Sequence, residues 1–370
     1  MIDFELGDEL SLIRETARGF ADDHLRPRDR EFEGERAVAG EVHEAFREIG
    51  LGGIELSEEF GGAGLGALAR VLVLEELAAA DAGAALALDP LGAALYPLSE
   101  LGGKSALESL ARPLLERSGA RALLVSDRRD ALRVEGETVS GEIPWVPADR
   151  VDLLVVLRPT GAFCVSEGFE LTELRGSGLR AAGAAQLKLA SAPICAVWEE
   201  TVGAQRALAR ARLYAAALLL GVMRASAEFS REYALNRVAF GRPIAHHQAL
   251  AFLIVDMATA IDGVRLLVWE AASRLDRGDD AAEACATAFL EAAEQAMFVT
   301  PNGLQILGGH GFMQDYPVEK YMREARTLSL FLGGPDEARE DAGRQLASRG
   351  EGDGGPGPAG LESDGARAEA

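Results

Sequence analysis

Cysteine and histidine are scarce in this chain. Of its 370 residues only three are cysteines, Cys164, Cys195 and Cys285, and they are scattered with no C-x-x-C pair. An odd number of isolated cysteines argues against a disulfide framework and against a zinc site. We therefore expect a reducing, cytoplasmic setting and no metal.

Excess positive charge and long apolar runs are lacking too. The chain has 37 Lys and Arg against 59 Asp and Glu, a net charge of −22. This argues against nucleic-acid binding, because contacts to phosphate dominate that affinity. The acidic start, M-I-D-F-E-L-G-D-E, does not resemble a signal peptide. No apolar run approaches the roughly 20 residues that a membrane helix needs, so we expect a soluble protein with no membrane partner.

Apolar residues make up 48% of the chain, enough to bury a large core in two or three domains. Residues 1–119 show apolar residues at helical spacing, interrupted by glycines and prolines. We expect an N-terminal helical domain there, with helices after Asp8 and over residues 40–49, 67–80 and 84–101.

Near Arg121 the helical pattern gives way to short apolar runs separated by Gly, Pro and Asp. Examples are A-L-L-V-S from Ala122, D-L-L-V-V-L from Asp152 and A-F-C-V-S from Ala162. Runs of this kind are typical of strands. The sequence therefore predicts a small antiparallel β domain over residues 120–198.

Helical spacing resumes over residues 199–348, the C-terminal domain. Residues 349–370 are rich in Gly, Pro and acidic residues with almost no bulky apolar side chains, so we predict a disordered acidic tail. The helices expected in the C-terminal domain are Val202–Asn236, Ala245–Asp276, Ala281–Leu307 and a segment from Val318–Arg326 that continues past Pro335.

One segment, Tyr233–Phe252, interrupts these helices and carries an unusual set of side chains. Gly241 supplies a stop and Pro243 prevents continuation, so the chain turns here into a second helix. Forked guanidinium donors, an aromatic face and a side-chain amide together suit a ligand that carries phosphate. These groups belong to Arg237, Arg242, Phe240 and Gln248.

Two motifs resemble the acyl-CoA dehydrogenase family. The first is R-x-x-F-G followed by a Gln eight positions after the Phe, and Arg237, Phe240, Gly241 and Gln248 match it. The second is Q-I-L-G-G-H-G-F over Gln305–Phe312, followed by Y-P-V-E-K-Y-M-R-E-A-R over Tyr316–Arg326. Two motifs in the family's order and spacing make the resemblance specific, and it extends over roughly residues 4–339.

The resemblance implies a mainly α fold with a small β domain: an N-terminal helical domain, a shortened middle antiparallel β domain and a C-terminal four-helix bundle. It implies an FAD cofactor, an acyl-CoA thioester substrate and a place in fatty acid or lipid metabolism. It also implies a homo- or hetero-oligomer, dimer or tetramer, whose subunits share each FAD site. An electron-transfer flavoprotein is a further expected partner.

Cofactor residues follow from the same resemblance. Arg237, Phe240 and Gln248 of the first motif are expected to contact FAD. Gln305 and the pair Gly308 and Gly309 are expected to grip the FAD of a neighbouring subunit, since glycine lets a backbone approach a ligand closely. The alternative for the glycines is an ordinary helix C-cap.

The middle domain matches the family less well. Trp145 lies where the family has W-I-T-N, which implies stacking on the flavin, and the alternative is a core tryptophan. Pro147 replaces the family's hydrogen-bonding Thr. The family's T-E-P-G-x-G-S-D, which contacts the cofactor, is replaced by L-L-V-S-D-R-R-D over Leu123–Asp130.

The family's catalytic Glu, which takes the α-proton of the substrate, is missing at both of its usual positions. Leu332 occupies the commoner position and Ala211 the other. Two carboxylates lie close by in sequence, Asp336 and Glu337. They are either the acidic first turn of a helix that begins at Pro335 or a relocated base.

Three hypotheses follow. The chain is an acyl-CoA dehydrogenase with a relocated or partner-supplied base, a non-catalytic subunit that pairs with an active homologue, or a flavoprotein with other chemistry such as oxygen activation. A positioned base contributes about 10²–10⁴ to the rate, so a chain without one would be a slow dehydrogenase.

Overall fold

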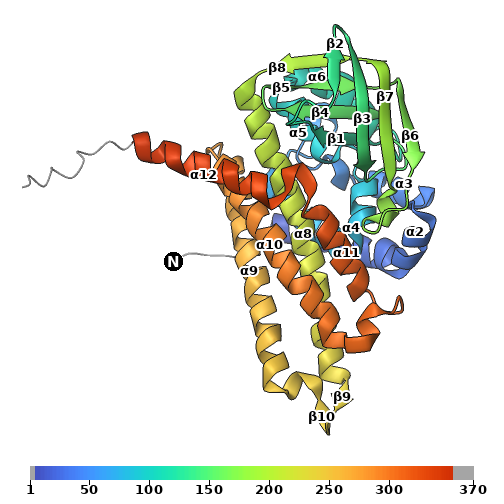
Figure 1. Ribbon diagram of the computed structural model, residues 1–370, viewed down its shortest axis with the longest axis vertical. Coiled ribbons are helices and arrows are strands. Elements are labelled where there is room, and N and C mark those ends of the chain that lie inside the picture. The colour runs from blue at the N-terminus through green and yellow to red at the C-terminus, as the bar shows by residue number, and fades with distance from the viewer. Residues whose placement is uncertain (1–4, 353–370) are drawn as a thin grey trace, which may run out of the picture.

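The computed structural model describes residues 5–352, with side chains through residue 347. Figure 1 shows two sheets at one end of the molecule and long helices that run from them to a small hairpin at the opposite end. The N-terminal helices lie beside the sheets and the upper part of the long helices. The part of the chain predicted to be a tail lies outside the described residues from residue 353 onward.

The N-terminal part is built around α4 (Ala67–Leu88), which is buried along almost its whole length. Asp81 breaks this helix with φ −160° and ψ 109°, and its carboxylate accepts a hydrogen bond from the Ala84 backbone N–H (2.9 Å). The break falls between the two helices predicted over residues 67–80 and 84–101. The second helix is shorter than predicted, because it ends at Leu88. The other elements here are α1 (Asp8–Phe20), η1 (Ala21–Leu25), η2 (Arg26–Arg28), α2 (Asp29–Glu35), α3 (Gly40–Glu48), η3 (Leu51–Gly53), η4 (Glu58–Phe60), η5 (Gly92–Ala94), α5 (Leu95–Glu100), α6 (Gly103–Ala106), η6 (Leu107–Ala111) and α7 (Arg112–Leu115).

Two four-stranded sheets form the middle part, with strand orders β1-β4-β5-β8 and β2-β3-β7-β6. The second sheet is antiparallel, but β1 pairs with β4 in parallel, so the prediction of a purely antiparallel domain was wrong. The β2–β3 hairpin lies between β1 and β4 in the chain, and a connection of that length allows parallel pairing. The strands are β1 (Ala122–Ser126), β2 (Arg133–Glu135), β3 (Thr138–Val146), β4 (Leu153–Arg158), β5 (Gly161–Val165), β6 (Phe169–Glu173), β7 (Ala185–Pro193) and β8 (Ala196–Glu199), with the short helix η7 (Arg180–Ala182) between β6 and β7.

The first sheet, which contains β4, lies between two apolar cores. Leu154 and Val156 are buried among the apolar residues that join the two sheets, whereas Leu153 and Val155 belong to the core shared with the helices. Side chains alternate across a strand, so a strand covered on both faces reads as an unbroken apolar run. The first sheet is therefore fixed against the helices. Strands β1 and β3, one from each sheet, lie where the sheets meet the helical bundle.

The C-terminal part is a bundle centred on α8 (Thr201–Asn236), which packs against α4 and α10. By length and composition α8 could cross a membrane, but 78% of its most apolar window is buried in protein. Helix α12 continues to Gly352, four residues beyond the predicted end of the domain. The other elements are β9 (Val238–Ala239), β10 (Arg242–Pro243), η8 (Ile244–His246), α9 (Gln248–Asp276), α10 (Ala282–Leu307), η9 (Gly308–Phe312), α11 (Val318–Leu328), η10 (Phe331–Gly333) and α12 (Gly334–Gly352).

Candidate functional site

A cavity of about 310 Å³ lies between strands β1 and β3 of the two sheets, α8 and the turn η10, and we call it the interdomain cavity. Trp145 near the end of β3, Ala211 inside α8 and Leu332 in η10 all line it. The three residues come from different parts of the chain, so only the packing of sheet on bundle brings them together. The two positions where the family has its base thus face the same cavity as the tryptophan expected at the flavin.

The turn η10 presents Leu332 and an aromatic ring to this cavity. Leu332 has φ 54° and ψ 37°, in the left-handed region that residues with a Cβ adopt only rarely. The ring of Phe331 lies 6.2 Å from the half-buried ring of Trp145, tilted by 55°. Trp145 is therefore neither fully exposed nor a fully buried core residue, and it forms part of the cavity wall.

The polar side of the cavity is a buried network around Asp89. Its carboxylate accepts hydrogen bonds from the Tyr214 hydroxyl (2.9 Å) and the Gly92 backbone N–H (2.9 Å), and it pairs with Arg70. Burial, together with the negative charge of Asp89, raises the pKa of Tyr214 well above its ordinary value. Asp89 is the one carboxylate among the described residues that line the cavity, and its oxygens are already occupied.

Arg121, the residue before β1, also lines the interdomain cavity. The side chain is 4% exposed and donates to the carbonyls of Ala182 (2.7 Å) and Pro147. Burial lowers the pKa of Arg121 to about 10, partly offset by Asp149. Because Pro147 lies two residues after Trp145, this contact fixes the backbone that carries the tryptophan. Sequence reasoning assigned no role to Arg121, since a single arginine at a domain border has no local signal.

The two acids proposed as a relocated base do not line the interdomain cavity. The side chain of Asp336 is 95% exposed and pairs with Arg339 (3.2 Å). Glu337 pairs with Arg128 (3.2 Å) across to the sheet part. Both lie in the first turn of α12, as the alternative of an acidic helix start predicts.

The other residues predicted to contact the cofactor lie at the far end of the bundle, which we call the bundle tip (residues 237–248 and 305–312; Figure 1). Phe240 occupies the turn between β9 and β10 and is 95% exposed. Gly308 is the C-cap of α10, with φ 59°, and a Cβ added at Gly308 or Gly309 would meet no atom within 4 Å. The predicted residues at this end are all exposed: Arg237, Phe240, Gln248, Gln305, Gly308 and Gly309.

The two motifs of the bundle tip contact each other through residues that the sequence did not single out. The Tyr233 hydroxyl hydrogen-bonds to Nδ1 of His310 (2.7 Å), and the His310 ring stacks on Tyr316 with centroids 5.3 Å apart. Tyr233 belongs to the first motif segment and His310 to the second. Histidine and tyrosine at these places could have been noted, but their pairing is visible only in the fold.

The hairpin of the tip is held by hydrogen bonds of the His247 ring. One ring nitrogen of His247 hydrogen-bonds to Arg242 (3.2 Å) and the other to the Ala239 carbonyl (3.3 Å). On α11, Arg323 donates to Glu319 (2.7 Å) and to Glu33 of α2 (2.6 Å). The His247 contacts stabilise the tip, whereas the Arg323 contacts join α11 to the N-terminal helices.

The interdomain cavity and the bundle tip are far apart in one chain. Ala211 and Arg237 lie within and at the end of the same helix, so at 1.5 Å per residue they are about 39 Å apart along its axis. One dinucleotide cannot contact both regions of a single chain. The predicted cofactor residues therefore form two groups, Trp145 at the cavity and the remainder at the tip.

Comparison with known proteins covers nearly all of the chain. Residues 202–347 match the family described as acyl-CoA dehydrogenase, C-terminal domain, and residues 7–116 match acyl-CoA dehydrogenase, N-terminal domain. The acryloyl-CoA reductase (NADH) of Anaerotignum propionicum is 28% identical, over 94% of this chain and 97% of that protein. The bovine mitochondrial short-chain specific acyl-CoA dehydrogenase is 29% identical, over 89% of this chain and 88% of that protein.

The fold is similar to solved structures as well. A chain in the structure of the electron transferring flavoprotein of Acidaminococcus fermentans superposes with a TM-score of 0.84 at 27% identity. The match covers 93% of this chain and 99% of that one. The mainly α fold with a small sheet part is thus confirmed.

Proposed function

The chain belongs to the acyl-CoA dehydrogenase family, and on that premise we propose that it is a flavin-dependent oxidoreductase acting on the CH–CH bond of an acyl-CoA thioester at the interdomain cavity. The observation that carries this proposal is the joint position of Trp145, Ala211 and Leu332 around one cavity of about 310 Å³. An apolar wall of this kind suits an acyl chain, and the aromatic pair suits a planar ring.

The residues present fit FAD if two chains hold it together. Trp145 offers an aromatic face, and β1 is an edge strand whose residues 122–126 line the cavity with backbone groups not paired to a further strand. At the bundle tip Arg237 offers a forked donor for phosphate, and Gly308 offers an open glycine backbone. When bound, the flavin would supply the hydride acceptor for the β-carbon of the substrate.

This chain's own residues bind and orient the substrate but provide no free carboxylate at the cavity among the described residues. Ala211 and Leu332 are apolar, and Asp89 is held by Arg70 and Tyr214. We therefore expect slow removal of the α-proton unless a partner chain supplies the base, since a positioned base contributes about 10²–10⁴ to the rate.

The relatives favour an oxidoreductase over a non-catalytic subunit. One is named a dehydrogenase and another a reductase of acyl-CoA substrates, which are the two directions of the same CH–CH chemistry. The similarity to a chain in an electron transferring flavoprotein structure supports such a flavoprotein as the electron partner. Oligomerisation through the bundle tip and a cytoplasmic location remain predictions.

The test is the absorption spectrum of the purified protein, alone and after co-expression with its genomic neighbours. We expect a flavin spectrum that bleaches under anaerobic conditions when butyryl-CoA is added and does not bleach with CoA alone. Colourless protein in both preparations would contradict the proposal. A flavin that is reduced only by substrates without a thioester would contradict the assigned substrate class.

A further inference from the structure

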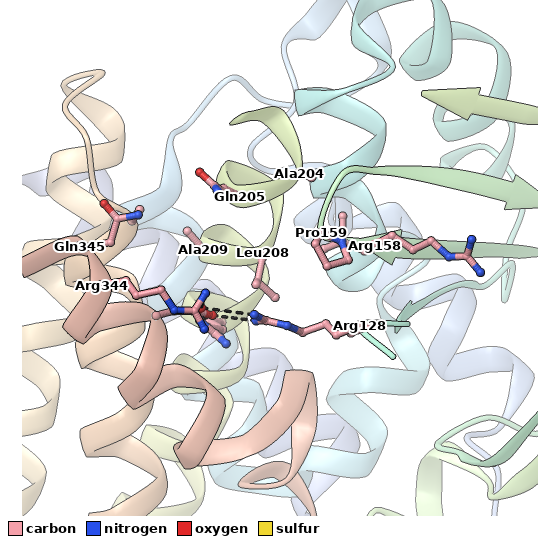
Figure 2. Close-up of a pocket in the computed structure, with 14 residues that line it drawn as sticks. Arg128, Arg158, Pro159, Ala204, Gln205, Leu208, Ala209, Arg344 and Gln345 are labelled. Carbon is pink, nitrogen blue, oxygen red and sulfur yellow. Dashed lines mark hydrogen bonds and ion pairs between the residues drawn. The ribbon is translucent and has the colours of Figure 1, made fainter. Parts of the chain in front are cut away.

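A second cavity, which we call the arginine cavity, lies between the sheet part, the first half of α8 and α12. Its volume is about 300 Å³, and four arginines line it in a chain whose net charge is −22. Ser126 lines this cavity and the interdomain cavity alike, and Arg212 directly follows Ala211 on α8. Figure 2 shows Arg128 and Arg344 reaching toward each other from opposite sides, whereas Arg158 points away.

Arg212 has hydrogen-bond donors without an acceptor among the described residues. Its side chain is 2% exposed, and Nη1 pairs with Asp341 (2.8 Å). Nε and Nη2 are buried and have no hydrogen-bond partner among the described residues. These two nitrogens form one edge of the guanidinium, the edge that binds a carboxylate or phosphate with two parallel hydrogen bonds. Buried donors without acceptors are costly, so this edge is suited to an oxyanion.

The other arginines that line the cavity are all engaged by carboxylates. Asp341 is the one carboxylate among the described residues lining the arginine cavity, and three arginines share it. Arg128 donates to Asp341 (2.7 Å), and Arg344 pairs with it at 3.3 Å. Arg158, by contrast, is engaged by Asp127 (2.9 Å) outside the cavity. Arg128 also pairs with Glu337 (3.2 Å) and Arg344 with Glu340 (3.1 Å), so the donors left for a ligand are those of Arg212.

We propose that the arginine cavity is an oxyanion-binding subsite in which Nε and Nη2 of Arg212 bind a carboxylate or phosphate group of the substrate. The inference rests on the proposed function, since it places this group beside the interdomain cavity that holds the acyl thioester. Two parts of such a substrate can carry the anion: the phosphates of the CoA portion, or a carboxylate on the acyl portion. Asp341 competes with the ligand for the same guanidinium.

The experiment is calorimetric titration of the full chain with CoA, with pantetheine, which lacks the phosphates, and with the dicarboxylate glutarate. We expect CoA or glutarate to bind, and Arg212→Gln to weaken that binding about 10- to 100-fold because a charge-assisted pair of hydrogen bonds is lost. Loss for CoA but not pantetheine identifies phosphate as the anion, and loss for glutarate identifies carboxylate. Arg206→Gln, at an exposed side chain of the same helix that does not line the cavity, is the matched control and should change affinity less than about threefold.

Two further variants separate ligand binding from a structural role. Arg212→Lys keeps the charge but loses the two-nitrogen edge, so it should recover only part of the affinity. Asp341→Asn removes the competing carboxylate and should tighten anion binding severalfold, the opposite of what damage to the fold would do. The inference is wrong if neither anion binds the wild-type chain, if Arg212→Gln leaves both affinities unchanged, or if Asp341→Asn weakens binding. The titrations use no flavin and no turnover, so their failure leaves the proposed oxidoreductase function standing.

Discussion

The interdomain cavity and the bundle tip differ in how complete they are within one chain. At the cavity, Ala211 is fully buried and Trp145 packs near Phe331, so one chain forms the walls by itself. At the tip, Phe240 is 95% exposed and the glycines after α10 face open space. Residues predicted to bind one cofactor can therefore lie far apart in a single chain. Under the proposed function, the cavity holds the reacting part of the site and the tip is a surface that we expect a second chain to cover.

The most demanding test of this contrast is to restore a base at the cavity. In Leu332→Glu a carboxylate enters a cavity whose described lining offers none that is free. We expect anaerobic flavin reduction by butyryl-CoA to become about 10²–10⁴-fold faster, the usual contribution of a positioned base.

Leu332→Gln is the matched control, because it has the same shape without a basic carboxylate. Stopped-flow absorbance measures both rates. Equal rates for the Glu and Gln variants would show that the reacting carbon does not lie at this wall, and the cavity would lose its assigned role.

At the bundle tip the expected effect is on cofactor affinity. Arg237→Ala removes a charge-assisted hydrogen bond to phosphate, a contribution of about 1.5–3 kcal/mol. We therefore expect FAD to bind about 10- to 100-fold more weakly, measured by flavin fluorescence after dialysis. Arg231→Ala, at an exposed residue near the end of the same helix, is the control. Unchanged affinity in Arg237→Ala would remove the tip from the cofactor site.

Helix α11 connects the tip to the cavity, and a pH effect on stability should arise there without affecting either region. Glu324 on α11 is 0% exposed, lies 3.3 Å from Lys320, and faces Asp81, which pairs with Lys320 at 2.9 Å. Burial raises the pKa of Glu324 from 4.5 to about 7. The folded chain thus holds this proton more tightly than the unfolded chain, so the stabilisation is full below pH 4.5 and declines as the pH rises to about 7.

Glu324→Gln mimics the protonated form and should escape this decline. Between pH 5 and pH 8 the variant should gain about 1–3 kcal/mol of unfolding free energy relative to the wild type. Urea denaturation at the two pH values measures the difference, with Glu228→Gln at an exposed side chain as the control. A difference that is the same at both pH values would mean that Glu324 stays ionised in the fold.

Much of the fold could be predicted from local patterns. The interruption near Asp81 and the turn at Gly241 and Pro243 were read from residue types whose backbone preferences act over a few positions. The parallel pairing of β1 with β4 was missed, because the direction of pairing between strands joined by a long connection depends on the path of that connection, which the strand residues do not encode. The apolar run of β4 carried a signal for burial on both faces, which is common in parallel sheets.

By itself the sequence determined the family, the three-part organisation and the fact that both usual base positions, Ala211 and Leu332, are apolar. These depend on motif order, periodicity and residue identity, all of which are local. The tertiary structure alone decided that those two positions share a cavity with Trp145 and that one edge of Arg212 is left without an acceptor. It also placed Ala211 at the cavity and Arg237 at the tip about 39 Å apart along α8. Burial and leftover hydrogen-bonding capacity arise from contacts between distant segments, which no local pattern encodes.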